Sequence, residues 1–485
     1  MRAMPGDGLI PCIPFDRRSA VPLHMQIYDG YRAAIVAGRL APGQRLPSTR
    51  ILADQLRISR FPVLSAFEQL HHDGYLDGRV GSGTFVRDHI PDELARPITV
   101  RRPQSRSSNR LPLPQYENDA DGHEPEPFRV GVPALDRFPH ETFARLVRRH
   151  ASRLLAGGDP AGHPPLREAI ADYLRTTRAV DCDAEQVLVV SGPQASVLIS
   201  ALALAGPGSS ICVEEPGNPA TSRTLTVANT GIIRVPVDES GIDVASIKRL
   251  TTRVAMVCVT PSHQYPLGVS LEMTRRLDLL GWAARNDAWI LEDDDDGEYR
   301  YTGRPLGALQ GMDTHDRVIY AGTFGKVLFP GLRIGYVVVP RELVPRFARL
   351  AEALDIACPP LYQLALTDFL TEGHLARHLL RMRSVHLVRR NALLAAVREH
   401  APDVLTLGAS DAGLRVVAFL RTQTDDTDVV RRALRRGLYP LALSHCYSGD
   451  DARHGLILGY GGSDERTLAG AVRKLVDVIQ MRSAA

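Results

Sequence analysis

The sequence predicts a two-domain protein in which a small α+β domain precedes a large α/β domain. The chain has 485 residues, more than one domain of roughly 100–200 residues needs. Its first 90 residues show helical periodicity that ends in a Gly-rich hairpin. From residue 187 onward, short β-rich runs alternate with helical segments. Between these two regions the apolar periodicity stops, which indicates a linker.

The composition indicates a folded protein without a membrane segment. Hydrophobic residues make up 44% and charged residues 23% of the chain, which excludes wholesale disorder. The sequence contains no apolar run of about 18 residues, and its N-terminus lacks the unbroken apolar stretch of a signal peptide. The six cysteines lie far apart, without CxxC or zinc-type spacing. We therefore expect a cytoplasmic protein with reduced thiols, no metal site and no membrane partner.

Residues 91–127 are predicted to be a Pro/Arg/Ser-rich linker. Seven prolines in this segment favour an extended, solvated backbone. Residues 96–110 hold five arginines and no acid, so this part of the linker can approach a polyanion. The predicted domains are therefore residues 17–90 and 128–485.

The first domain is predicted to contain three helices and a hairpin. The first helix covers about 23–37, with Ile27, Tyr31, Ala34 and Ile35 facing inward. Ser48 can cap a second helix that holds Ile51, Leu52 and Leu56. Ser59 can cap a third helix that ends at His72, with Val63, Leu64, Phe67 and Leu70 facing inward. The Gly-rich turn at 78–83 then joins two short strands. This order of elements predicts a winged helix-turn-helix.

In a winged helix-turn-helix the third helix enters the major groove of DNA. Arg60, at the start of that helix, can reach base edges or phosphates, and Arg45 and Arg50 face the DNA backbone. The predicted DNA-binding residues are Arg45, Ser48, Arg50, Ser59, Arg60, Gly81 and Ser82. The alternative is a winged helix that makes only protein contacts.

This domain resembles the GntR family of bacterial regulators. The resemblance lies in PLHMQIYDGYRAAIVAGRLAPGQRLPSTRILADQL, in the SR pair that follows, and in GYLDGRVGSGTFV. Phe61-Pro62 departs from the family pattern, which has a polar residue and then Thr after Ser-Arg. Proline is tolerated in the first helical turn, so we expect the fold to survive and a phosphate-contacting hydroxyl to be absent.

Seven β-rich runs predict a mostly parallel, seven-stranded sheet in the second domain. They cover 187–190, 211–215, 232–237, 254–260, 288–293, 317–322 and 334–340. Ligands of such sheets bind at the carboxyl ends of the strands. Two clusters at those ends are ambiguous alone: SGPQA at 191–195 can bind a phosphate or simply turn the chain, and PSHQYPLG at 261–268 is a rigid loop.

Two further clusters indicate a function more specifically. Five acids at 292–296 are either a solvated loop, a magnesium site, or a set that includes one functional carboxylate. Lys326 is one of only three lysines in a chain with 58 basic residues. An arginine cannot form an imine, so a lysine retained between glycines is a candidate Schiff-base amine. A structural lysine is the alternative.

An amine, a carboxylate at a strand end, a phosphate-binding turn and a nearby arginine together match what pyridoxal 5'-phosphate requires. Their order resembles fold-type-I aminotransferases, and more closely the MocR-type regulators, which join a GntR winged helix to such a domain. The resembling segments are PSHQYPLGV, WILEDDDDGEYRYTGRPLGALQ and IYAGTFGKVLFPGLRIGYVVVP.

The resemblance implies roles for individual residues. Lys326 would form the internal aldimine, and Asp293 would pair with the pyridinium nitrogen. The phosphate would be bound by residues of two loops, namely Thr323, Arg333, Gly192 and Gln194. Gln264 would lie near the phenolic oxygen.

Four positions depart from the family pattern. Asp295 and Asn218 each replace a Tyr near the cofactor, Gly325 replaces the Ser before the lysine, and His445 replaces the Arg that anchors a carboxylate. A carboxylate at 295 must be protonated, turned away or paired with a cation. Arg415 and Arg453 are candidate substitutes for the anchor.

Three functions follow as hypotheses. The leading one is a homodimeric transcription regulator that reads paired half-sites in operator DNA and senses pyridoxal phosphate, or a small amine or amino acid, through an external aldimine at Lys326. The second is a working aminotransferase with an accessory winged helix; the departures at Asp295 and His445 weaken it, so we do not expect a physiological catalyst. The third is a regulator of this fold that has lost the cofactor.

Overall fold

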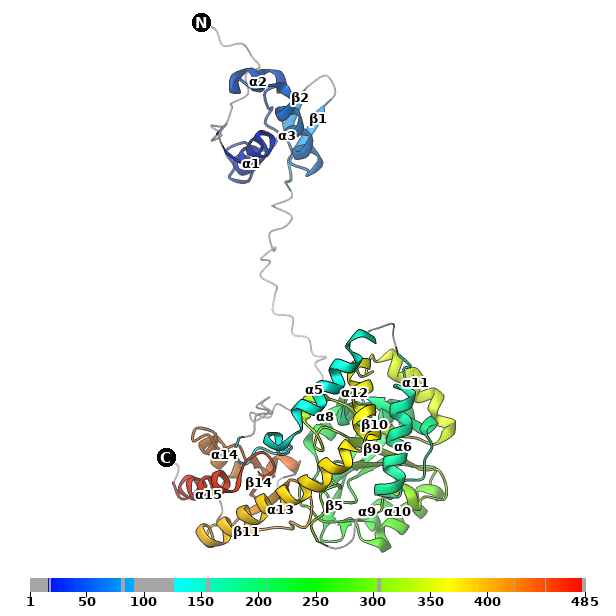
Figure 1. The fold of residues 1–485 in the computed structure, drawn as a ribbon. Helices are drawn as coiled ribbons and strands as arrows, with labels where there is room; N and C mark the ends of the chain where they lie inside the picture. Colours follow the sequence, from blue (N-terminus) through cyan, green and yellow to red (C-terminus); the bar gives the residue numbers. More distant parts are fainter. Residues whose placement is uncertain are drawn as a thin grey trace. The chain divides into compact units, whose positions relative to one another are not determined.

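The computed structural model describes residues 16, 19–79, 83–90, 126–153, 158–206, 208–302, 307–422, 424–449 and 451–481. The chain divides into two compact units, residues 1–109 and 110–485 (Figure 1). The predicted linker at 91–127 lies almost wholly outside the described residues. The domain bounds 17–90 and 128–485 therefore stay predictions.

The first unit is a winged helix-turn-helix, as predicted. Its elements are α1 (Leu23–Val36), α2 (Thr49–Leu56), α3 (Arg60–His72), β1 (Leu76–Arg79) and β2 (Gly83–Val86). β1 and β2 pair antiparallel and form the wing. α1 packs against α3, where the rings of Tyr31 and Phe67 meet edge to face with centroids 5.2 Å apart.

Some local predictions for this unit are confirmed and others are wrong. The Ser48 side chain accepts a hydrogen bond from the Ile51 N–H (3.3 Å) and caps α2. Ser59 precedes α3, but its side chain makes no capping hydrogen bond. Leu64 was predicted to face inward but is 37% exposed. On α3 the buried position goes instead to Ala66, because the core-facing stripe runs through 63, 66, 67 and 70.

The second unit is built on an eight-stranded sheet. Its strands are β3 (Val187–Val190), β4 (Ser210–Glu215), β5 (Gly231–Asp238), β6 (Gly241–Ile242), β7 (Val254–Val259), β8 (Trp289–Asp294), β9 (Val318–Thr323) and β10 (Gly335–Val338). Their order is β3-β10-β9-β8-β7-β4-β5-β6. The seven predicted strands are all present, and the two-residue β6 adds an edge strand. β10 runs antiparallel to both of its neighbours, whereas β4, β5, β7, β8 and β9 pair in parallel.

Helices cover both faces of this sheet, which explains why its strands are continuous apolar runs. The helices of this unit are α5 (His140–His150), α6 (Pro164–Arg178), α7 (Pro193–Leu204), α8 (Pro219–Val227), α9 (Val244–Lys248), α10 (Met273–Arg285), α11 (Val344–Ala353), α12 (Pro360–Thr371), α13 (His374–His400), α14 (Asp426–Leu434) and α15 (Glu465–Gln480). Of these, α14 and α15 belong to the C-terminal part and not to this sheet. Within β3, Val187 and Val189 pack in the same cluster as α6 and α12, while Leu188 packs with α7 and α11. Alternate residues of one strand therefore serve opposite layers.

A second, antiparallel sheet lies in the C-terminal part and was not predicted. It contains β11 (Leu405–Leu407), β12 (Arg415–Leu420), β13 (Leu441–Ala442) and β14 (Gly455–Gly459), in the order β11-β12-β14-β13. α13, α14 and α15 pack on it around one apolar cluster, at the lower left of the large unit in Figure 1. Among the helices of the described residues, none is both long and apolar enough to cross a bilayer.

Candidate functional site

The site lies where β7, β8 and β9 end. These strands are adjacent and parallel, with Val259 opposite Glu292 and Asp294 opposite Gly322. The loop after β7, the acidic run and the lysine loop therefore meet at one edge of the sheet, as the sequence predicts.

The acids at 292–296 do not form a solvated loop, so that interpretation is wrong. Four of the five are buried, and each of those four has its own partner. Glu292 accepts hydrogen bonds from the Leu309 and Gln310 N–H groups (2.8 and 2.9 Å). Asp294 accepts from the buried Arg178 guanidinium (2.7 Å) and the Tyr320 hydroxyl (2.5 Å). In the part of the chain that the structure describes, the only possible metal-ligand cluster is Asp425, Asp426 and His454, so the magnesium interpretation gains no support.

Asp293 is the exception in the acidic run. Its side chain lines a small cavity together with Asn218, Cys258 and Thr260, and no hydrogen bond or ion pair to its carboxylate is recorded among the described residues. Burial, with the neighbouring Asp295 charge, raises the pKa of Asp293 to about 8, although Lys326 opposes the shift. The carboxylate is thus placed to gain from a cationic partner in the cavity.

Lys326 follows β9 by three residues and forms an ion pair with Asp295. The lysine side chain is 20% exposed and the aspartate side chain 9%. Gly131 lies against the lysine stem: a Cβ at this position would be 3.7 Å from the Lys326 Cε. Of the three arrangements expected for a carboxylate at 295, the structure therefore has the one paired with a cation.

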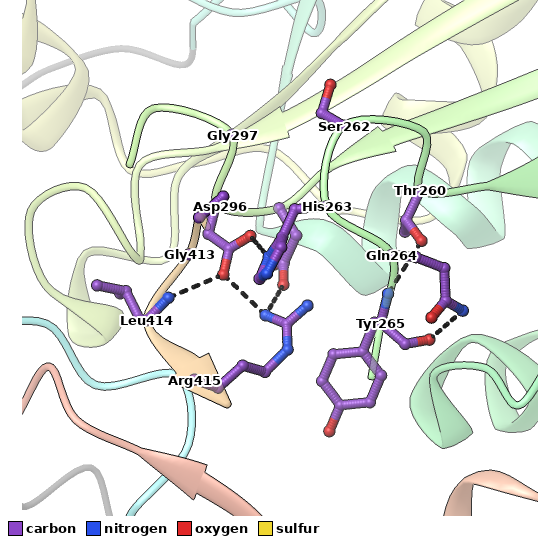
Figure 2. A network of polar contacts seen from close by, with 12 residues as sticks. Thr260, Ser262, His263, Gln264, Tyr265, Asp296, Gly297, Gly413, Leu414 and Arg415 are labelled. Carbon is purple, nitrogen blue, oxygen red and sulfur yellow. Dashed lines mark hydrogen bonds and ion pairs between the residues drawn. The ribbon is translucent and has the colours of Figure 1, made fainter. Parts of the chain in front are cut away.

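Asp296 joins the large sheet to the C-terminal part. Its carboxylate contacts the His263 Nδ1 (2.7 Å), the Arg415 Nη1 (2.8 Å) and the Leu414 N–H (3.3 Å) (Figure 2). Burial alone would raise the pKa of Asp296, but Arg415 and His263 outweigh it and hold the pKa well below the usual range. The buried Arg415 guanidinium also lies over the Tyr265 ring (4.5 Å) and 3.7 Å from Asp295. Arg415 is therefore part of the internal network, and its role as a substitute anchor stays a prediction.

A second cavity, of about 110 Å³, lies beside the first. Its lining includes Asn218, Arg223, Tyr265 and His445, and Asn218 lines both cavities. Asn218 also caps α8 by accepting a hydrogen bond from the Ala220 N–H (3.0 Å). The predicted effector residue His445 is thus brought to a cavity, together with an arginine that the sequence did not single out.

The predicted phosphate residues come from separate loops. Gly192 caps α7 with φ 113, a conformation that favours glycine, and the Gln194 side chain accepts a hydrogen bond from the Thr224 hydroxyl (2.6 Å). Thr323 is buried and accepts from the Gly325 N–H (3.1 Å). Arg333 is exposed, with left-handed backbone (φ 48) after the turn at Pro330–Leu332. Their joint role in phosphate binding stays a prediction.

Two predicted residues have other partners. The Gln264 amide donates to the Pro216 and Tyr265 carbonyls (2.8 and 2.6 Å), and its oxygen accepts from the Leu267 N–H (3.0 Å). Its side chain therefore holds the loop together. The Arg453 guanidinium lies over the Phe419 ring (3.9 Å) on the surface, and Arg453 is not part of the lining of the cavity that contains His445.

The predicted DNA-binding residues gather at the starts of α2 and α3. The Arg60 Nε donates to the Thr49 Oγ1 (3.1 Å), so the first turns of the two helices are adjacent. The Arg45 guanidinium lies against the start of β2, where a Cβ at Gly83 would be 3.0 Å from its Nε. Arg50 is exposed on α2. Gly81 and Ser82 lie outside the described residues.

Sequence reasoning missed four residues that shape the site: Arg178, His263, Arg223 and Gly131. Arg178 ends α6, 116 positions before its partner Asp294, and nothing in its local sequence marks that pairing. His263 was visible as part of PSHQYPLG, but its partner Asp296 lay inside a run of acids with no sign of which acid it would meet.

The comparisons agree with this architecture. Residues 23–86 match the gntR family of bacterial regulatory proteins, and residues 115–454 match aminotransferase class I and II. The chain is 40% identical to the probable rhizopine catabolism regulatory protein MocR of Rhizobium meliloti, over 95% of this chain and 94% of that one. It is 32% identical to the pyridoxine biosynthesis transcriptional regulator PdxR of Corynebacterium glutamicum, over 94% and 96%.

A solved structure gives the same fold for the second unit. Kynurenine aminotransferase of Pyrococcus horikoshii, in complex with PMP, aligns with a TM-score of 0.68 and 26% identity. The alignment covers 74% of this chain and 91% of that one. A winged helix followed by a fold-type-I aminotransferase domain is therefore confirmed, and the chain belongs to the MocR-type transcriptional regulators of the GntR family.

Proposed function

We propose that this regulator binds operator DNA through α3 and the wing, and that a ligand at Lys326 changes this binding. The proposed ligand is pyridoxal phosphate, alone or with a small amine or amino acid. The observation that carries the proposal is the half-buried Asp293 carboxylate, which has no hydrogen-bond or ion-pair partner among the described residues and lies at the same strand ends as Lys326. The naming of PdxR after pyridoxine biosynthesis agrees with a ligand of this chemistry.

The residues present fit pyridoxal phosphate. Burial and the Asp295 charge raise the pKa of Asp293, and a protonated pyridine nitrogen beside it would favour the ionised carboxylate. Pyridoxal phosphate supplies an aldehyde to which an amine can bind covalently. Lys326 would provide that amine, and Asp293 would hold the ring nitrogen protonated. The first turn of α7 would offer N–H groups to the phosphate.

The second cavity suits an effector that carries an acidic or polar group. Arg223 and His445 line it and can provide donors, and Asn218 lies between the two cavities. A ligand can shift the DNA-binding arrangement only by the difference between its affinities for two states. We therefore propose that the effector closes the C-terminal part on the large sheet, across the link between Asp296 and Arg415.

The direct test is reduction of the protein with borohydride after incubation with pyridoxal phosphate. A lysine-bound cofactor is expected on the peptide that contains Lys326 by mass spectrometry. Lys326→Ala should remove the adduct, and Lys248→Ala, which breaks a surface ion pair with Asp278, should not. A protein that takes up no pyridoxal phosphate would instead support the third hypothesis, loss of the cofactor.

A second candidate function is transamination, which the likeness to kynurenine aminotransferase favours. Asp295 opposes it, because its carboxylate holds the Lys326 ammonium that proton transfer would need free. Many turnovers with an amino acid and a keto-acid acceptor would reverse this ranking. We further propose that the protein is a cytoplasmic homodimer. Light scattering of the purified chain tests the oligomeric state.

A further inference from the structure

The outward face of α3 carries apolar side chains. Phe61 is 77% exposed, the highest value among the large hydrophobic residues that the structure describes. Leu64 is 37% exposed, and Glu68 is exposed as well. Spacings of three and four residues place these side chains on one face of the helix. The opposite face, which includes Val63 and Phe67, is buried in the core of the module.

The surroundings of this face favour a polyanionic partner. Arg60 precedes Phe61 and contacts Thr49 at the start of α2, and Arg45 and Arg50 are exposed. Two helix N-termini lie together there and add positive potential. An apolar protein surface would have to desolvate these charges, whereas DNA would pair with them.

We propose that Phe61 and Leu64 recognise the 5-methyl groups of thymines in the major groove. The inference rests on the DNA-binding function and on α3 as the element that enters the groove. The thymine methyl is the apolar feature of the base edges in that groove, and side chains such as Phe contact it. Glu68 agrees with this orientation, because a carboxylate is repelled by phosphates but accepts a hydrogen bond from the amino group of cytosine.

The helix geometry specifies which bases are read. Three residues of an α-helix rise about 4.5 Å, which is between one and two base-pair steps of about 3.4 Å. Phe61 and Leu64 therefore contact methyl groups at neighbouring base pairs. The departure at Phe61-Pro62 from the polar family pattern thus exchanges a phosphate contact for a base contact.

The test uses the full-length protein and a duplex that it selects from a pool of random synthetic DNA. Each thymine of the selected duplex is replaced in turn by deoxyuridine, which removes only the methyl group. Affinity should fall roughly three- to fivefold at one or two adjacent positions, the loss expected when one methyl group is no longer buried. Phe61→Ala should abolish the sensitivity at one position and Leu64→Ala at its neighbour.

Val21→Ala is the matched control, since Val21 is 45% exposed in the same module but precedes α1. It should retain the full sensitivity to deoxyuridine. Because Phe61 is exposed, its removal should leave the circular dichroism of the protein unchanged.

Three results would overturn the proposal. A duplex whose affinity is indifferent to every deoxyuridine rejects the inference alone, because specific DNA binding is then retained. A Phe61→Ala variant that keeps its methyl sensitivity but loses a dimer in light scattering shows that the face is a protein contact. Failure of the protein to select any duplex rejects the inference together with the proposed DNA-binding function.

Discussion

Asp295 and Lys326 form an ion pair at the carboxyl edge of the large sheet, so the amine proposed to bind the cofactor already has a partner in the protein. Arg415 lies 3.7 Å from the same carboxylate. The two cations therefore share Asp295. A ligand that binds Lys326 must therefore break its ion pair with Asp295.

Asp295→Asn should increase the affinity for pyridoxal phosphate by roughly fivefold. A partly buried ion pair contributes about 1 kcal/mol, which no longer has to be lost when Lys326 takes a new partner. The measurement is an absorbance titration of the purified protein with the cofactor. Asp278→Asn, which breaks the exposed pair with Lys248, should leave the affinity unchanged. Equal or weaker binding by Asp295→Asn would show that the pair does not compete with the cofactor.

Asp293→Asn should stabilise the cofactor-free protein, and increasingly so as pH rises. The pKa of Asp293 is about 8 in the folded protein against an ordinary value of 3.8. Between these values the unfolded chain holds fewer protons on this group, so its contribution to stability declines as pH rises from about 4 to 8. Asparagine does not titrate, so the variant loses no stability at this position as pH rises.

Thermal unfolding at several pH values measures this effect. The difference in Tm between Asp293→Asn and the parent should widen by a few degrees from about pH 5 to 8. Asp172→Asn, at a side chain 63% exposed on α6, should show a constant difference. With saturating pyridoxal phosphate the order should reverse, because the pyridine nitrogen then loses its carboxylate.

Arg415→Met should destabilise the second unit by about 3–5 kcal/mol. It leaves the buried Asp296 carboxylate without its guanidinium partner and with Asp295 close by, and an uncompensated buried charge carries that cost. Urea unfolding gives the comparison. Arg453→Met removes an exposed arginine that stacks on Phe419 and should cost less than about 1 kcal/mol. Equal losses in the two variants would contradict the structural role of Arg415.

Arg60→Ala should lower the affinity for the selected operator roughly tenfold or more, the effect of one lost bidentate base contact. Fluorescence anisotropy across several salt concentrations measures it. Arg39→Ala removes the same charge from an exposed residue outside α2, α3 and the wing. An equal loss in both variants would show that Arg60 contributes only its charge.

The fold could be predicted from the sequence wherever consecutive side chains share one environment. The strands of the large sheet are covered on both faces, so residues such as Val187 and Leu188 both had to be apolar. The two-residue β6 and the short strands of the C-terminal sheet were missed because a few residues hold too little periodicity. Leu64 was misjudged because an apolar residue on a helix can also serve an external partner.

The site was predictable in its members but not in its pairings. Lys326 stood out because a lysine is rare in this chain, and Asp293 because it lies near the end of a strand. A shift of one residue along the run at 292–296 would change which acid pairs with which cation. The arginines that pair with these acids lie more than 100 positions away in the sequence. Those contacts are set by tertiary packing, which a single sequence does not specify.

The segment that follows the predicted linker packs between the C-terminal sheet and Lys326. The Phe128 carbonyl accepts a hydrogen bond from the Gly459 N–H (2.9 Å), and the Tyr439 N–H donates to the Pro127 carbonyl (2.9 Å). Three residues after Phe128, Gly131 lies against the stem of Lys326. One short stretch of backbone therefore contacts both the C-terminal sheet and the side chain of the amine proposed to bind the cofactor.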